Sequence, residues 1–161
     1  MLYLFYGEDT YRSRKKVRDI TDRFYAVAGG RESAERVLLA ECTPKELEFI
    51  LKSGSLFRNK RLVVLEEPSG ASADMLTYVE SQVPWLAESA DVFVVWDGAA
   101  QNMSAGLWKA LQAHASKTQE FKKLGPERAL RFLDDEAKAR GITLSASDKH
   151  HLLSDFTGDT W

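Results

Sequence analysis

The sequence predicts a three-layer α/β domain over residues 1–121, built on a parallel sheet of four or five strands. Short apolar runs of strand length, of which Leu2–Tyr6 and Asp91–Asp97 are the clearest, alternate with longer segments whose apolar residues recur at helical spacing. Strands separated by single helices imply parallel neighbours joined by right-handed crossovers. After Phe121 two helical segments follow without a strand between them, which indicates a second, all-helical unit.

The first strand and helix are the simplest to place. Leu2–Tyr6 is a continuous apolar run, as expected for a strand buried on both faces of a sheet. A helix is expected from residue 9 or 10 to residue 28, where a pair of glycines ends it. Its expected apolar stripe consists of Val17, Ile20, Phe24 and Val27.

The next elements follow the same alternation. Arg36–Ala40 predicts a second strand, and Thr43 with Glu46 has the spacing of a capping box that starts a helix ending near Ser53. The remaining elements of the domain are expected to be a strand at Arg61–Glu67, a helix from Ala71 that Pro84 ends or kinks, a strand at Asp91–Asp97, a helix at Ser104–Ala115 and an edge strand at Thr118–Phe121.

The last 40 residues, 122–161, are expected to form part of a small helical domain. One helix is predicted from about Leu124 through Arg140, and another begins near Ser145. The sequence stops at Trp161, where a further helix is expected, so we interpret the chain as a fragment of a longer protein.

Composition excludes several classes of protein. The 161 residues carry a net charge of −2, so the sequence gives no sign of indiscriminate binding to nucleic acid. Cys42 is the only cysteine, which rules out an internal disulfide and suits a reducing compartment. The N-terminal apolar run is too short for a signal peptide, and no stretch approaches the ~20 apolar residues of a membrane span. We therefore expect a cytoplasmic protein that does not contact membranes.

A parallel sheet whose first strand runs into a glycine turn raises the question of a nucleotide site. A phosphate-binding loop needs Gly, four residues, and then Gly-Lys-Ser or Gly-Lys-Thr, and the residues after Gly7 contain no such motif. Glu8 and Asp9 instead put negative charge where a phosphate would lie. We interpret these two carboxylates as caps for the helix dipole, and we predict no bound cofactor.

We predict no other catalytic site from the sequence. There is no Gly-x-Ser-x-Gly turn, and the adjacent pair His150 and His151 would diverge on a helix, so neither a hydrolase nor a metal site is expected. One alternative stays open, a diverged P-loop-like NTPase or kinase in which Glu66 or Asp97, at the ends of strands, would hold Mg²⁺.

The first helix carries a run of basic residues, Arg12, Arg14, Lys15, Lys16 and Arg18. One interpretation is a solvated helix face whose charge is balanced by Asp19 and Asp22. The other is a surface of a stand-alone DNA-binding module, which would bind with strong salt dependence.

The stretch from Ser53 to Arg61 places two large apolar residues, Leu56 and Phe57, between a glycine turn and three cations. Adjacent residues cannot share one face of a strand, and on a helix they lie about 100° apart, so burying both requires a special loop. Two interpretations follow. The pair is either a staple that covers the edge of the sheet or an apolar plug presented to another protein.

Several motifs occur together in order along the chain: Leu4–Tyr11 (LFYGEDTY), Ser55–Phe57 (SLF), Arg61–Glu66 (RLVVLE), Val92–Val94 (VFV) and Phe121–Leu124 (FKKL). With them the chain resembles the delta-subunit family of the bacterial DNA polymerase III clamp loader. The resemblance implies an AAA+-like α/β domain, a small helical lid and a helical collar. Here the lid would be cut short and the collar absent.

The same resemblance implies a function. Members of that family do not hydrolyse ATP, and they work within a holoenzyme classed as a DNA-directed DNA polymerase, a nucleotidyltransferase. The implied partners are the β sliding clamp, other clamp-loader subunits that bind mainly through the collar and, indirectly, primed DNA. In the family the Leu-Phe pair enters an apolar pocket of the clamp and opens the ring. This resemblance assigns clamp binding to Leu56 and Phe57, with a surrounding rim of Ser55, Arg58, Lys60 and Arg61.

Overall fold

The computed structural model describes residues 1–28, 33–53 and 60–155. Its centre is a sheet of five strands, all parallel to their neighbours, in the order β2-β3-β4-β1-β5. The strands are β1 (Leu2–Tyr6), β2 (Ala34–Leu38), β3 (Leu62–Glu66), β4 (Val92–Asp97) and β5 (Lys117–Glu120). The predicted parallel α/β sheet is therefore confirmed, with five strands.

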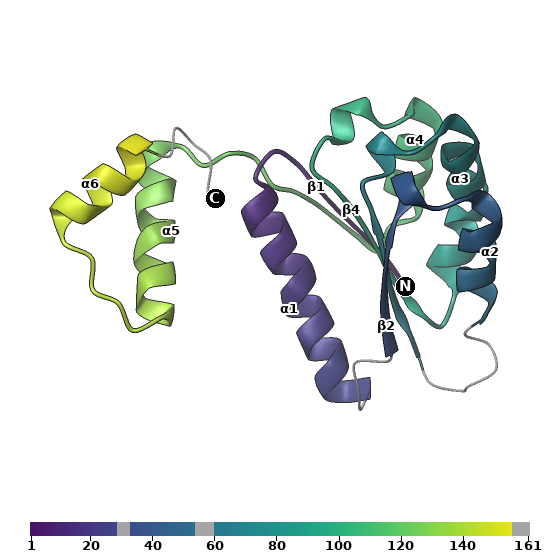
Figure 1. Ribbon diagram of the computed structural model, residues 1–161, viewed down its shortest axis with the longest axis horizontal. Helices are drawn as coiled ribbons and strands as arrows, with labels where there is room; N and C mark the ends of the chain where they lie inside the picture. Colours follow the sequence, from purple (N-terminus) through teal and green to yellow (C-terminus); the bar gives the residue numbers. More distant parts are fainter. Residues whose placement is uncertain (29–32, 54–59, 156–161) are drawn as a thin grey trace.

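The helices cover the sheet on both faces and so make three layers, as Figure 1 shows. One face is covered by α1 and the other by α2, α3 and α4. The helices of the described residues are α1 (Thr10–Ala28), α2 (Pro44–Ser53), α3 (Ala73–Glu88), α4 (Ala105–His114), α5 (Pro126–Ala139) and α6 (Ala146–Asp155).

Two hydrophobic cores explain why β3 and β4 are apolar at every position before the acidic residue that ends each of them. On β4, Phe93 and Val95 face the core under α2, α3 and α4, whereas Val94 and Trp96 face the core under α1. Because successive side chains of a strand point to opposite faces, a strand covered on both sides carries apolar residues at successive positions. The same alternation holds on β1 and β3.

Some boundaries differ from the sequence prediction. The second strand is Ala34–Leu38 and not Arg36–Ala40, because it pairs with β3 only as far as Glu66. The apolar residue Leu39 is buried instead in a short 3₁₀ turn, which makes the strand look longer in sequence than it is.

Two further expectations about helices concern Pro84 and Val27. Of the two alternatives for Pro84, an end of the helix is wrong, since α3 runs on to Glu88 and buries Val83 and Leu86 on either side of the proline, and a kink stays a prediction. Burial of those two side chains outweighs the one backbone hydrogen bond that proline cannot make. Val27, expected in the buried stripe of α1, is exposed, although Val17 of that stripe is buried as predicted.

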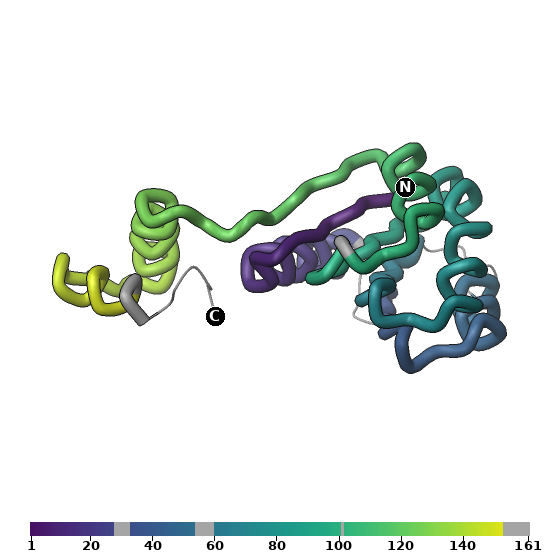
Figure 2. Tube along the Cα trace, turned by 90° about the horizontal axis from the view of Figure 1, so that it is seen from above, coloured from purple at the N-terminus to yellow at the C-terminus, as the bar shows by residue number. Residues whose placement is uncertain are grey.

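The last two helices lie beyond α1, at the end of the molecule farthest from α2, α3 and α4, and Figure 2 shows the extended segment that leads to them. Their contact with the α/β domain is made through α1, where the rings of Tyr11 and Phe132 meet edge to face. Their assignment to a separate lid domain stays a prediction. No helix in the described ranges is long and apolar enough to cross a membrane.

Candidate functional site

In a nucleotide-binding α/β domain the phosphate binds at the N-terminus of the helix after the first strand, and here a carboxylate of the chain lies at that place, the start of α1. The side chain of Asp9 is buried, and its Oδ1 accepts the backbone N–H of Arg12 at 2.9 Å. Its Oδ2 pairs with the Arg12 guanidinium at 2.6 Å. The predicted capping role of Asp9 is confirmed, whereas Glu8 is exposed beside it.

The backbone donors around this turn are also engaged within the chain. The N–H of Gly7 donates to the carbonyl of Asp97 at 3.1 Å, and that of Asp9 donates to the carbonyl of Phe121 at 3.0 Å. A phosphate cradle needs such N–H groups to point at the ligand. Because these donors have internal acceptors and a buried carboxylate caps the helix, the turn is chemically unsuited to an anion.

The segment after β5 explains why this turn is closed. Gly7 has a φ of +125°, and a Cβ atom added to it would lie 2.4 Å from the carbonyl oxygen of Phe121. The Arg12 guanidinium reaches the same segment and donates to the carbonyl of Lys122 at 2.6 Å. Only glycine fits where the backbone passes this close, so the glycine turn is accounted for by packing.

The two carboxylates that could hold Mg²⁺ in the alternative enzyme are bound to protein groups. Asp97 is buried and accepts hydrogen bonds from Ser69 N–H (2.7 Å), Ser69 Oγ (2.9 Å) and Ala99 N–H (2.7 Å). Glu66 pairs with Arg36, whose Nε lies 2.7 Å from it. Within the described part of the chain, no three His, Cys, Asp or Glu side chains are arranged to hold a metal ion.

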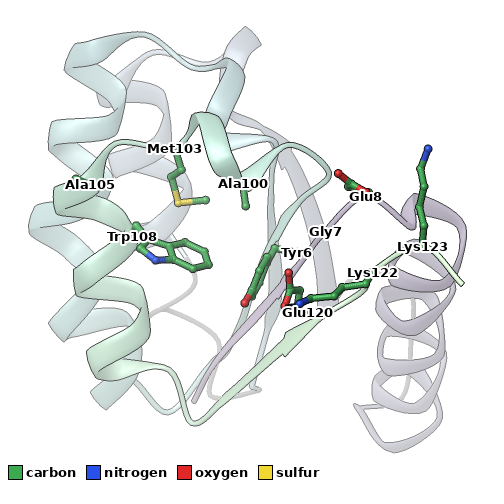
Figure 3. Close-up of a pocket in the computed structure, with 10 residues that line it drawn as sticks. All are labelled: Tyr6, Gly7, Glu8, Ala100, Met103, Ala105, Trp108, Glu120, Lys122 and Lys123. Carbon is green, nitrogen blue, oxygen red and sulfur yellow. Dashed lines mark ion pairs between the residues drawn. The ribbon is translucent and has the colours of Figure 1, made fainter. Parts of the chain in front are cut away.

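A pocket of about 870 Å³ opens beside the same turn, at the ends of β1 and β5 (Figure 3). One wall is apolar and contains Met103 and the edge-to-face pair of Tyr6 and Trp108, whose ring centroids are 4.8 Å apart. Burial, and then the charge of Glu120, raise the pKa of the Tyr6 hydroxyl. The charged lining residues are Glu8, Glu120, Lys122 and Lys123.

The charges of this pocket cancel in pairs, and Lys122 lies 3.4 Å from Glu120. A site for a nucleotide carries a surplus of positive charge or a set of free backbone donors. The pocket has equal numbers of acidic and basic side chains, so its chemistry does not select an anion.

The basic run of α1 is largely used within the molecule. Arg14 pairs with Glu67 at 3.1 Å and stacks on the ring of Trp96, with 4.3 Å from its Cζ to the ring centroid. Lys15 pairs with Glu136 of α5, and Arg140 pairs with the same carboxylate at 2.7 Å. With Arg12, which donates to the carbonyl of Lys122, three of the five cations thus connect α1 to other parts of the chain, which neither interpretation from the sequence anticipated.

Four of the predicted clamp-binding residues, Ser55, Leu56, Phe57 and Arg58, lie outside the described residues. Their two flanks are described, namely the end of α2 at Ser53 and the residues Lys60 and Arg61 before β3. Lys60 is exposed, as a rim charge would be, and Arg61 is only partly accessible.

Arg61 binds three groups of its own chain. Its guanidinium donates to the carbonyls of Ile50 and Leu51, both at 2.9 Å, and its Nε lies 3.3 Å from Asp91. Its backbone N–H donates to the same carboxylate at 3.0 Å. These contacts join the last turn of α2 to the starts of β3 and β4. The partners are 10 to 30 residues away, so no local sequence pattern could have indicated them.

Sequence analysis also missed the exposed side of α2. Phe49 is 74% exposed, the largest exposure of an aromatic side chain among the described residues. It lies off the buried stripe of Leu47 and Leu51 and next to the half-buried Ile50. The signal for its exposure was available, because a helix can bury only one stripe and Phe49 is two residues from each member of that stripe.

Comparison with known proteins identifies the fold. No protein-family model matches the chain, and no curated protein matches it in sequence. Among solved structures, the DNA clamp loader delta protein of Bacillus subtilis is similar over 94% of this chain and 47% of its own, with 21% identity and a TM-score of 0.60.

The RuvB Holliday junction branch migration motor of Thermotoga maritima is similar over 98% of this chain and 49% of its own, with 9% identity and a TM-score of 0.63. The chain thus spans about half the length of each of these structures. Identities this low speak for the fold alone. The strand order and these likenesses show that the chain has an AAA+-like α/β domain.

Proposed function

We propose that the chain is part of a clamp-loader subunit of the delta type, which binds the β sliding clamp and opens the ring during DNA replication without hydrolysing ATP. In this proposal Leu56 and Phe57 enter an apolar pocket of the clamp. Other clamp-loader subunits would bind mainly through the helical collar that the resemblance implies, and contact with primed DNA would be indirect.

The observation that carries the proposal is an AAA+-like fold whose phosphate position is taken by its own groups. The buried carboxylate of Asp9 caps α1, and Gly7 donates its N–H to the carbonyl of Asp97. An enzyme of this fold that turns over a nucleotide needs a phosphate-binding loop there, whereas a subunit of the delta type, which does not hydrolyse ATP, needs none. The likeness to a clamp loader delta protein over 94% of the chain supports the fold on which the proposal rests.

The energetics of the proposed contact are adequate. Burying one Leu and one Phe side chain contributes roughly 1.5–3 kcal/mol each. Anchors of this kind, when they fill a pocket near the centre of an interface, commonly dominate its binding energy. A cation at the rim, such as the exposed Lys60, would act mainly on the association rate.

The test is binding of the 161-residue chain to an immobilised bacterial β sliding clamp, measured by surface plasmon resonance. The variant Leu56→Ala/Phe57→Ala is expected to lose binding while keeping the helical circular dichroism of the unchanged chain. Phe49→Ala is the matched control, because it removes an exposed aromatic side chain from α2 and leaves the pair intact.

Three results would count against the proposal. If the double variant binds the clamp as well as the unchanged chain does, Leu56 and Phe57 do not form the binding contact. If it loses its fold together with binding, the pair is part of the hydrophobic core instead. Heat released on titration with micromolar ATP, in the absence of any clamp binding, would favour the nucleotide-dependent enzyme instead. No heat with ATP, together with heat on titration with the clamp, supports the proposal.

A further inference from the structure

The residues that flank the Leu56–Phe57 pair are joined by one side chain. Residues 54–59 connect the end of α2 to the start of β3, and Arg61 contacts both of these elements and β4 as well. We call Arg61 with its partners Ile50, Leu51 and Asp91 the Arg61 brace.

The guanidinium of Arg61 suits the groups at the C-terminal end of α2. The last carbonyls of a helix have no partner within the helix, and they carry the negative end of its dipole. The planar guanidinium offers several donors in a fixed arrangement, so it can reach two neighbouring carbonyls and a carboxylate at once. Arg61 does this with distances of 2.9, 2.9 and 3.3 Å.

The low exposure of Arg61 and Asp91 distinguishes the Arg61 brace from a charge at the rim of an interface. The side chains of Arg61 and Asp91 are 17% and 19% exposed, respectively, whereas Lys60, the preceding residue, is exposed. The main chain adds to the connection, because Val92 donates its N–H to the carbonyl of Arg61 at 2.8 Å. A guanidinium with three partners inside the chain is poorly placed to steer an incoming partner.

We propose that Arg61 is a positioning residue for clamp binding: it holds the end of α2 against the first residues of β3 and β4, and so sets the geometry from which the Leu56–Phe57 segment is presented. This inference rests on the proposed function. It replaces the role of rim charge that the sequence predicts for Arg61 and leaves that role to Lys60. A binding element held at its base needs less ordering when the partner binds, which increases affinity.

The experiment compares Arg61→Lys, Arg61→Ala and Lys60→Ala by surface plasmon resonance with the β sliding clamp at low and high salt. Arg61→Lys keeps the charge but cannot contact all three partners. It is expected to raise Kd about tenfold, nearly as much as Arg61→Ala, through a faster dissociation rate and to a similar extent at both salt concentrations. Lys60→Ala is expected to slow association at low salt only.

A second measurement does not depend on the clamp. Amide hydrogen exchange in the last turn of α2 is expected to be faster in Arg61→Lys and in Asp91→Asn than in the unchanged chain, while exchange in α4 stays the same. Asp91→Asn is the variant that tests the brace if either Arg61 variant fails to fold.

The outcomes separate the two proposals. Binding of Arg61→Lys equal to that of the unchanged chain, or exchange in α2 unaffected by both substitutions, would overturn the positioning role and leave the proposed function standing. If Leu56→Ala/Phe57→Ala also binds like the unchanged chain, the proposed function is the one that fails, and this inference fails with it.

Discussion

The ion pairs of Glu136 provide a test of how the C-terminal helices are attached to the α/β domain. Glu136 lies on α5, with a side chain only 11% exposed, and it pairs with Lys15 of α1 and with Arg140, the residue that follows α5. The hydroxyl of Tyr11 also donates to it at 3.3 Å. The substitution Glu136→Gln keeps the size of the side chain and removes its charge. We expect it to weaken the contact between α1 and α5 without affecting the sheet.

The expected magnitude follows from the exposure of the partners. The side chain of Lys15 is 39% exposed, so solvent screens its pairing with Glu136, and the pair contributes about 0.5–1 kcal/mol rather than the larger value of a fully buried pair. That loss should raise the amide hydrogen-exchange rates of α5 by roughly two- to fivefold, since about 1.4 kcal/mol corresponds to tenfold. Exchange in β4 should not change.

The effect of pH on the contact between α1 and α5 provides an independent test of the Glu136 ion pairs. Burial alone would raise the pKa of Glu136, but the hydrogen bonds and charges of Lys15 and Arg140 outweigh it and hold the pKa below its ordinary value of 4.5. A carboxylate with a lowered pKa in the folded state stabilises the contact above that ordinary value, and the stabilisation is lost as the pH falls through the folded pKa. The difference between Glu136→Gln and the unchanged chain should therefore disappear at acidic pH.

The control for this experiment is Glu48→Gln. It removes one partner of an exposed ion pair with Lys52 within α2, and it should leave exchange in α5 as it is. If Glu136→Gln also leaves α5 unchanged, or if it accelerates β4 as much as α5, the ion pairs do not fasten the helical unit and the reasoning is refuted.

Two further predictions concern the closed turn at the end of β1. Gly7→Ala should lower the free energy of unfolding in urea by at least the roughly 1–3 kcal/mol of backbone strain, because its Cβ would also meet the backbone of Phe121. Gly125→Ala, whose Cβ meets nothing within 4 Å, is the control, and equal stability of the two variants would contradict the close packing. Asp97→Ala should cost roughly 1–3 kcal/mol for each donor left unpaired, Ser69 among them, and added Mg²⁺ should not change the melting temperature of the unchanged chain. A rise with Mg²⁺ that Asp97→Ala abolishes would restore the metal-binding interpretation.

Much of the fold could be predicted because it depends on local patterns. The strand expected at Asp91–Asp97 is present as Val92–Asp97, and the capping pair of Thr43 with Glu46 appears in the structure as expected. The boundaries of β2 were less predictable, since they depend on where pairing with β3 stops. The exposure of Val27 likewise depends on how much of α1 the sheet covers, which no window of sequence contains.

In the candidate site, too, some features could be predicted from the sequence and others could not. The missing phosphate-binding motif after Gly7 was visible in the sequence, and the cap on α1 supplied by Asp9 could be predicted from its position. The role of Arg61 could not, because a basic residue between an exposed lysine and a strand has the same appearance in sequence whether it faces solvent or its own chain.

The sequence by itself determined the succession of strands and helices along the chain, because side-chain periodicity and caps act over a few neighbouring residues. Only the tertiary structure decided which charged side chains form ion pairs with other residues of the chain. Lys15 and Glu136 meet across 121 positions, and Arg61 and Asp91 across 30. Such pairs depend on how the elements pack in space, and packing brings together residues whose separation along the chain carries no trace of the contact.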